Sequence, residues 1–359
     1  MLDFIDSWLV NGGWIVAILL IVLGCIALIK GADFLVDGAS GLAKKYGVSD
    51  IIIGLTVVAF GTSMPEFVVN MVAVGQGSTE IAITNVLGSN IINIFVILGL
   101  TALIYPISSQ RSTRRFEIPF SLLAAFLVLL FAVYNSPSWL HIEHLFNIDI
   151  TEPSLRDLGS IQVGAGNSGF ISGIGGSILL ILFIVFLWHN FKGIGNAPNT
   201  ESTEDYKPMS SRRALALIIG GLVGLVIGGE VIVKSATSIA QSLGVSDAII
   251  GLTVVALGTS LPELATSCMA AFKKNCDIAL GNVVGSNIFN IFFILGTSAC
   301  VKELPGYHGL EIDALMAALG SIFVMLFVYL SKKHEIKRWH GAILLLSYIG
   351  YLTYRICTL

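Results

Sequence analysis

Two glutamates, Glu66 and Glu263, lie in the middle of long apolar segments. A carboxylate at the centre of a bilayer costs roughly 3 kcal/mol on insertion scales, so an acid at that depth is expected to have a function. One alternative is that each glutamate merely bonds a neighbouring helix, but no Lys or Arg lies midway along the adjacent segments to neutralise it. Paired carboxylates offer the hard oxygens that Ca²⁺ prefers, and Ca²⁺ takes about six to eight of them. The pair therefore predicts an intramembrane cation site.

Each glutamate ends a GTS-x-PE motif that supplies further oxygens. Thr62 and Ser63 precede Glu66 by four and three residues, which places all three on one helix face. Pro65 cannot donate to the carbonyl four residues back, so we expect the helix to break there and expose carbonyl oxygens to the site. Hydroxyl and carbonyl oxygens are suitable ligands for Na⁺. The second copy repeats the arrangement in Thr259, Ser260, Pro262 and Glu263.

A second motif, GSN-xx-N, follows each glutamate by about twenty residues and adds amide and hydroxyl groups. In both copies a serine and an asparagine are four residues apart, so their side chains can face the same cavity. These residues are Ser89 with Asn93, and Ser286 with Asn290. The other asparagines of the motif are interpreted as partners of backbone groups: Asn85, Asn90, Asn282 and Asn287.

The elements that carry these motifs are predicted to be transmembrane helices. Of the 359 residues 55% are hydrophobic and only 12% are charged, whereas a soluble domain carries about 25% charged residues. A spanning helix needs roughly 20 apolar residues. The chain offers ten such stretches, near 14–34, 50–74, 81–104, 116–134, 170–190, 213–236, 247–271, 278–301, 312–331 and 339–356. We therefore expect an all-α integral membrane protein with ten spans.

The chain is an internal duplication. Residues 47–99 and 244–296 align without a gap and share 32 of 53 positions. The copies lie five spans apart, and because five is odd the second copy crosses the membrane in the opposite sense. Such inverted repeats are typical of secondary transporters, with the substrate site near the midplane. The alternative is a duplicated scaffold without transport. We expect a first five-helix repeat at 1–190, a cytoplasmic linker at 191–212 and a second repeat at 213–359.

The cations set the orientation. If the N-terminus lies outside, fifteen of the 20 Lys and Arg residues fall in inside segments and four in outside segments, while Lys30 lies within the first span. Cytoplasmic loops collect Lys and Arg. We therefore expect a multi-pass protein of the cell or inner membrane with both termini outside the cytoplasm.

Antiport is predicted from the charge of the site. Two carboxylates supply a charge that one Ca²⁺ or several Na⁺ can balance, and an empty site leaves them bare in low dielectric. Alternating access would slide the first and sixth spans past the core. A rival is proton/calcium exchange, because a buried glutamate can bind H⁺, although the hydroxyls of Ser63 and Ser260 favour Na⁺. A remote alternative is a cation channel, and no HExxH motif or nucleophile–base pair suggests an enzyme.

At the paired motifs GTSMPE/GTSLPE and GSNIIN/GSNIFN the sequence resembles the sodium/calcium exchanger family of the cation/calcium antiporter superfamily, in its compact prokaryotic form. The resemblance implies that Ca²⁺ is held by Glu66 and Glu263 with the carbonyls of Thr62 and Thr259. It implies Na⁺ sites at Ala59, Ser63, Glu66, Ser89, Ala256, Ser260, Glu263 and Ser286. Asn93 and Asn290 fill the remaining polar positions.

One departure concerns the charge of this predicted cage. Some relatives carry Asp at the position of Asn290. With Asn the cage holds two negative charges rather than three, which leaves the coupling ratio open and argues against K⁺ co-transport. Beyond transported cations and the lipid bilayer, the sequence implies no cofactor, nucleic acid or protein partner.

Overall fold

The fold is built almost wholly of helices, and the computed structural model describes them over residues 3–134, 169–192, 209–244, 256–307 and 309–358. The first half contains α1 (Asp3–Tyr46), α2 (Asp50–Ile53), η1 (Gly54–Val58), α3 (Ala59–Thr62), α4 (Met64–Gly75), α5 (Thr79–Ile92), η2 (Asn93–Leu98), α6 (Gly99–Ile104), α7 (Arg111–Arg115), α8 (Glu117–Tyr134) and α10 (Gly173–Lys192). The second half contains α11 (Ser211–Ser242), α13 (Ala256–Thr259), α14 (Leu261–Phe272), α15 (Cys276–Ile288), η6 (Phe289–Leu295), α16 (Gly296–Val301), α17 (Leu310–Leu330) and α18 (Arg338–Thr358). Most of the predicted linker 191–212 lies outside the described residues.

Among the described residues, seven helical segments are long and apolar enough to cross a membrane. They are Gly13–Tyr46, Thr79–Ile104, Arg111–Ala132, Gly173–Lys192, Ser211–Ser242, Cys276–Val301 and Leu310–Leu330. The bent pair Asp50–Thr62 and Met64–Gly75 makes an eighth. Of the two remaining expected spans, 339–356 corresponds to α18, and 247–271 is described only from Ala256, as α13 and α14. The prediction of an all-helical, multi-span membrane protein is confirmed.

Among the described residues, four very short strands pair between the two halves. Strand β1 (Ile107–Ser108) pairs antiparallel with β4 (Glu335–Ile336). Strand β2 (Gly169–Ile171) pairs antiparallel with β3 (Leu304–Pro305). In each pair one strand comes from the first half and one from the second. Each pair also joins two connections that the predicted topology places on the same side of the membrane, so the pairing agrees with the expected alternation of spans.

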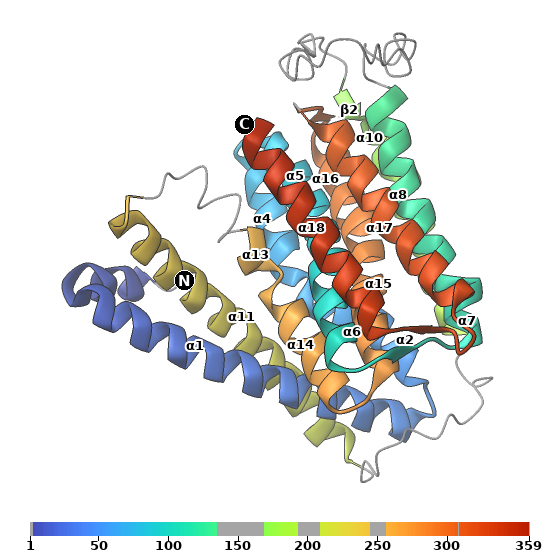
Figure 1. The fold of residues 1–359 in the computed structure, drawn as a ribbon, viewed down its shortest axis with the longest axis horizontal. Coiled ribbons are helices and arrows are strands. Elements are labelled where there is room, and N and C mark those ends of the chain that lie inside the picture. Colours follow the sequence, from blue (N-terminus) through green and yellow to red (C-terminus); the bar gives the residue numbers. More distant parts are fainter. Residues whose placement is uncertain (1–2, 135–168, 193–208, 245–255, 308, 359) are drawn as a thin grey trace.

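Helices α1 and α11 form a long antiparallel pair with glycines at its contact surface (Figure 1). A Cβ added at Gly31 would lie 2.8 Å from the carbonyl oxygen of Gly221, and one added at Gly24 would lie 2.9 Å from that of Gly228. Only glycine permits backbones to approach so closely. In Figure 1 the pair meets the remaining helices near the C-terminal half of α1 and leans away from them toward its N-terminal end.

Two element boundaries and the helix type of some segments differ from expectation. Helix α1 extends beyond the predicted 14–34 to Tyr46, because the polar residues that follow the apolar stretch bind other helices instead of entering a loop. The predicted span 170–190 starts late, since 169–171 form β2 and α10 begins at Gly173. Segments η1, η2 and η6 are π-helical, a distortion that often occurs at functional sites and that a 3.6-residue periodicity does not predict.

Candidate cation site

Each glutamate lies just after an interruption in its helix. Between α3 and α4, Ser63 leaves the helical conformation with φ −84° and ψ 4°, and the two helices are bent by 45°. Between α13 and α14, Ser260 adopts nearly the same angles, −90° and 7°. Glu66 and Glu263 therefore fall in the first turn of α4 and α14. Free N–H groups and the positive end of the helix dipole at this position favour negative charge.

The two carboxylates are buried and belong to one site. Glu66 is 1% exposed and Glu263 is 0% exposed. Ser63 Oγ donates a 2.9 Å hydrogen bond to Glu263 Oε1, and Ser260 Oγ donates one of 3.5 Å to Glu66 Oε1. Each acid is thus hydrogen-bonded to the helix break of the opposite half. These two contacts bring the acids of opposite halves to the same pair of helix breaks.

Several buried oxygens in this region have no hydrogen-bond partner among the residues that the structure describes. They are Glu66 Oε2, Glu263 Oε2, Asn93 Oδ1, Asn290 Oδ1 and Ser286 Oγ. An unsatisfied buried acceptor costs about 1–3 kcal/mol, so a group of them requires a physical explanation. In the described part of the chain neither carboxylate forms an ion pair with Lys or Arg. A cation bound by these oxygens would satisfy both the orphaned lone pairs and the uncompensated charge.

Four asparagines cross-link α5–η2 and α15–η6 with nearly two-fold symmetry. Asn93 Nδ2 donates to Asn287 Oδ1 at 3.0 Å, and Asn290 Nδ2 donates to Asn90 Oδ1 at 3.1 Å. Asn90 and Asn287 each donate to the other's main-chain oxygen, at 3.3 and 3.5 Å. The amide nitrogens of Asn93 and Asn290 are therefore occupied between the halves. Their side-chain oxygens remain available as ligands.

Two further asparagines hold the main chain of the glutamates. Asn85 Nδ2 donates to the carbonyl oxygen of Glu66 at 3.4 Å, and Asn282 Nδ2 donates to that of Glu263 at 3.2 Å. Asn282 Oδ1 also accepts a 3.1 Å hydrogen bond from Thr62 Oγ1, which belongs to the other half. The sequence analysis interpreted both asparagines as partners of backbone groups, and these two hydrogen bonds agree with that interpretation. Both lie nineteen residues after the glutamate whose main chain they hold.

The other predicted site residues are distributed along the same helices. Ala59 begins α3 and is buried, and Ser89 is buried on α5, one turn before Asn93. Thr259 ends α13 and is half-buried. Ala256 begins α13, but its side chain lies outside the description, as do residues 245–255 of the second copy. In the described ranges no three His, Cys, Asp or Glu residues cluster so as to hold a metal, so the site consists of two carboxylates and neutral oxygens.

Helix α11 packs against the glycine of both GTS motifs. A Cβ added at Gly61 would lie 2.5 Å from Leu222 Cδ2, and one added at Gly258 would lie 2.1 Å from Val233 Cγ2. These glycines immediately precede Thr62 and Thr259. The absence of a side chain at each glycine therefore lets α11 lie directly beside both half-sites.

Comparisons with known proteins show which proteins the chain is similar to over most of its length. The family model described as "Sodium/calcium exchanger protein" matches residues 16–192 and 213–357. The sodium/calcium exchanger MaX1 of Methanosarcina acetivorans is 32% identical over 352 residues, covering 93% of this chain and 97% of MaX1. The inner membrane protein YrbG of Escherichia coli K12 is 33% identical, covering 84% of this chain and 83% of YrbG.

Solved structures of a sodium-calcium exchanger are also similar to this chain over nearly its whole length. One of the sodium-calcium exchanger NCX_Mj superposes with a TM-score of 0.74 at 31% identity, covering 94% of this chain and 98% of that chain. A second, soaked with Na⁺ and Sr²⁺, gives a TM-score of 0.73 at 32% identity, covering 94% of this chain and 97% of that chain.

Proposed function

Because the chain belongs to the sodium/calcium exchanger family, whose members are membrane transporters and not enzymes, we propose that it exchanges Ca²⁺ for Na⁺ across the membrane. The observation that carries the proposal is the reciprocal pairing of Ser63 with Glu263 and of Ser260 with Glu66. It unites two buried acids from opposite halves at the helix breaks. No basic partner in the described part of the chain satisfies them.

Exclusive occupancy by one kind of ion follows from the charge of the site. One Ca²⁺ balances Glu66 and Glu263, with the main-chain carbonyls of Thr62 and Thr259 as additional ligands. Na⁺ ions use the same carboxylates together with neutral oxygens. The proposed Na⁺ ligands are contributed by Ala59, Ser63, Glu66, Ser89, Ala256, Ser260, Glu263 and Ser286, with Asn93 and Asn290 as supporting polar groups. Since both ions need Glu66 and Glu263, one must leave before the other binds.

Alternating access is the proposed route of transport. Helices α1 and α11 contact each other through glycines, and they move as one unit past the glutamate-bearing helices. When neither ion is bound, two carboxylates would face each other in low dielectric, which disfavours the return of an empty carrier. Obligatory exchange then needs no additional gate.

Proton/calcium exchange is the second candidate, because a glutamate that is buried can carry a proton between the two faces of the membrane. The orientation of the Ser63 and Ser260 hydroxyls toward the carboxylates favours Na⁺. A proton on Glu66 or Glu263 would itself satisfy one oxygen, whereas Na⁺ requires several neutral oxygens around it.

The proposed topology places both termini outside the cytoplasm of an inner or plasma membrane. The repeats at 1–190 and 213–359 are joined by the linker 191–212 on the inside. The cation bias of the predicted loops supports this orientation, and the strand pairs β1–β4 and β2–β3 support the alternation of the spans.

The test is uptake of radioactive Ca²⁺ by proteoliposomes loaded with Na⁺. We expect uptake that requires an outward Na⁺ gradient and persists when a protonophore removes the pH gradient. Uptake that follows the pH gradient and ignores Na⁺ would support the proton exchanger instead. Ca²⁺ flux without any opposing ion gradient would support a channel.

A further inference from the structure

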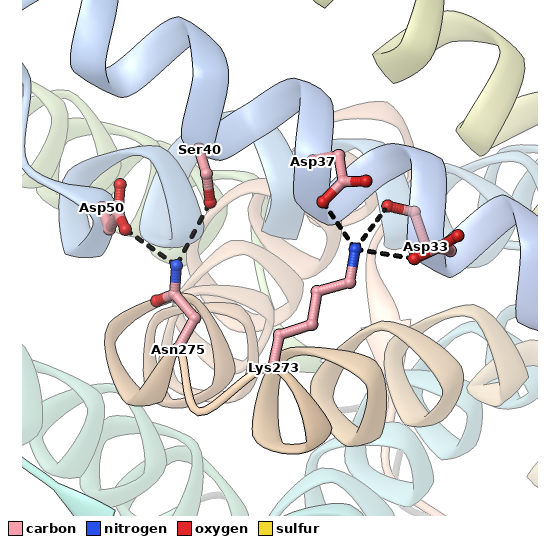
Figure 2. A network of polar contacts seen from close by, with 6 residues as sticks. All are labelled: Asp33, Asp37, Ser40, Asp50, Lys273 and Asn275. Atoms are coloured by element: carbon pink, nitrogen blue, oxygen red, sulfur yellow. Dashed lines mark hydrogen bonds and ion pairs between the residues drawn. The ribbon is translucent and has the colours of Figure 1, made fainter. Parts of the chain in front are cut away.

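A lysine at the end of α14 binds two aspartates of α1 (Figure 2). Lys273 Nζ lies 2.6 Å from Asp33 Oδ1 and 2.5 Å from Asp37 Oδ1. It also donates to the main-chain oxygen of Asp33 at 3.3 Å. The lysine side chain is 17% exposed, so these ion pairs are screened less than fully solvated ones. One cation from the core thus joins two acidic side chains, one helical turn apart, on α1.

A second contact reinforces the first. Asn275, in the turn between α14 and α15, donates through Nδ2 to Ser40 Oγ at 3.2 Å and to Asp50 Oδ2 at 2.7 Å. Figure 2 shows the two groups of contacts side by side, with Lys273 and Asn275 facing Asp33, Asp37 and Ser40 of α1, and with Asp50 at the start of α2. We call the contacts of Lys273 and Asn275 with Asp33, Asp37 and Ser40 the α1 latch.

The α1 latch acts on more than α1. The backbones of α1 and α11 touch through Gly24, Gly31, Gly221 and Gly228, and Tyr46 Oη lies 2.9 Å from Ser211 Oγ at the same end of the pair. A contact that fixes α1 to the α14–α15 turn therefore fixes the whole α1–α11 pair. This is also the end at which the pair meets the core in Figure 1.

The internal duplication provides a built-in comparison. The repeat offset of 197 residues pairs Lys273 with Gln76, and it pairs Asp33 and Asp37 with Glu230 and Lys234. At the opposite end of the molecule the core residue is thus neutral, and one of the two acids is replaced by a base. The cation–diacid arrangement occurs in one copy only. Because the two copies are inverted, this difference distinguishes the two faces of the membrane.

We propose that the α1 latch biases alternating access toward the state that is closed at the cytoplasmic face. The inference depends on the proposed transport function, and its sidedness follows the predicted orientation, in which Lys273 lies inside. The glycine contacts between α1 and α11 are alike in the two copies and cannot favour one face. The α1 latch differs from the equivalent residues of the other copy, Gln76, Glu230 and Lys234, and can therefore favour one face. Breaking it shifts the population toward the inward-open state.

The first test follows the conformation and does not depend on which ions are carried. Hydrogen–deuterium exchange is measured on the full chain in lipid for Lys273→Gln and Asp37→Asn. We expect faster exchange in peptides covering 33–46 and 272–277, and slower exchange at the opposite end, in peptides covering 76–80 and 236–243. Lys274→Gln is the matched control, because it removes an equal charge from the adjacent, exposed residue. Asp37→Lys combined with Lys273→Asp should restore the wild-type pattern.

The second test uses transport from each face of sided vesicles. A carrier's apparent affinity at one face depends on the fraction of molecules open to that face. Lys273→Gln should lower the KM for Ca²⁺ at the cytoplasmic face and raise it at the outer face, so that the ratio of the two KM values changes by about threefold, which lies within the range for a partly exposed ion pair. Gln76→Lys with Lys234→Asp should produce the opposite shift.

The outcomes separate the two proposals. If hydrogen–deuterium exchange becomes faster only near residue 273 and does not become slower at the opposite end, the contact has a local structural role and the inference is wrong. The inference is also wrong if Lys273→Gln and Lys274→Gln change hydrogen–deuterium exchange in the same way. If the wild-type protein carries no Ca²⁺ against Na⁺, the proposed function fails, while hydrogen–deuterium exchange still decides whether the α1 latch sets the conformational balance.

Discussion

Ser63 Oγ lies 2.9 Å from Glu263 Oε1, although the two residues are 200 positions apart in the sequence. The reciprocal contact between Ser260 and Glu66 is 3.5 Å, so the two halves of the site are related but not identical. In each contact the hydroxyl comes from a residue at a helix break and the carboxylate from the first turn of the other half's helix. In the inverted duplication, the serine of each copy therefore donates a hydrogen bond to the glutamate of the other copy.

These serines should matter more for Na⁺ than for Ca²⁺. Removing one hydroxyl ligand costs about 1 kcal/mol, or roughly fivefold in affinity. We expect Ser63→Ala and Ser260→Ala to raise the Na⁺ concentration for half-maximal Ca²⁺ efflux by about that factor, with Ser63→Ala the stronger because its contact is shorter. The measurement is the Na⁺ dependence of efflux from Ca²⁺-loaded vesicles. A change in Ca²⁺ affinity with an unaltered Na⁺ dependence would contradict the assignment.

The asparagines that hold the glutamate main chain should differ in importance. Asn282 bonds Glu263, Ser267 and Thr62, and loss of a buried polar partner costs about 1–3 kcal/mol. We expect Asn282→Ala to raise the KM for Ca²⁺ by about tenfold and Asn85→Ala to raise it less. Asn190→Ala is the control, because Asn190 is buried and its side-chain amide donates to the main-chain oxygen of Phe186 in its own helix. Equal effects of Asn190→Ala and Asn282→Ala would indicate general destabilisation.

Adjacent glycines of α11 give a matched pair for the α1–α11 contact. A Cβ at Gly221 would lie 2.7 Å from both Gly31 O and Leu35 N, whereas one at Gly220 would meet nothing within 4 Å. Backbone atoms cannot move aside as a flexible side chain can. We expect Gly221→Ala to lower the thermal midpoint in detergent by several degrees, about 1–3 kcal/mol of overpacking, and Gly220→Ala to leave it unchanged or raise it. Similar midpoints for both variants would refute the close contact.

The glycines of the two GTS motifs should respond unequally to alanine. At Gly258 the added Cβ would collide with a branched valine, Val233, which is restricted about χ1, whereas at Gly61 it would meet the flexible end of Leu222. We expect Gly258→Ala to impair Ca²⁺ exchange more than Gly61→Ala does. Val233→Ala should restore exchange to Gly258→Ala. If Val233→Ala gives no rescue, the close packing of α11 is not the reason for this glycine.

The fold class was predictable because its signals are local or repeated. Apolar stretches of spanning length and a gapless internal repeat predicted an all-helical membrane protein with inverted halves, and the helices and the comparisons confirm this class. The length of α1 was not predictable, because its last turns are stabilised by contacts such as Asp37 with Lys273, 236 residues away. The strand pairs β1–β4 and β2–β3 likewise depend on register between distant loops.

The candidate site was predictable in its acids and less so in its connections. Equivalent positions in an inverted repeat meet near the centre, so Glu66 and Glu263 were expected together, and the structure brings them together. The hydrogen bonds between the side-chain amides of the two halves depend on the rotamers at their contact. The residues concerned are Asn90, Asn93, Asn287 and Asn290. Sequence spacing contains no information about that choice. The role of these residues in binding cations stays a prediction.

The most direct test of the account is Ca²⁺ uptake into Na⁺-loaded proteoliposomes by Glu66→Gln and Glu263→Gln. Each variant keeps the shape of the side chain and removes one of the two charges that attract the ion. Glu117→Gln is the matched control, since Glu117 is also a buried glutamate within a spanning segment but lies outside the site. We predict that both site variants insert in the membrane and exchange no Ca²⁺ for Na⁺, while Glu117→Gln remains active. Normal exchange by either Glu66→Gln or Glu263→Gln would contradict the account.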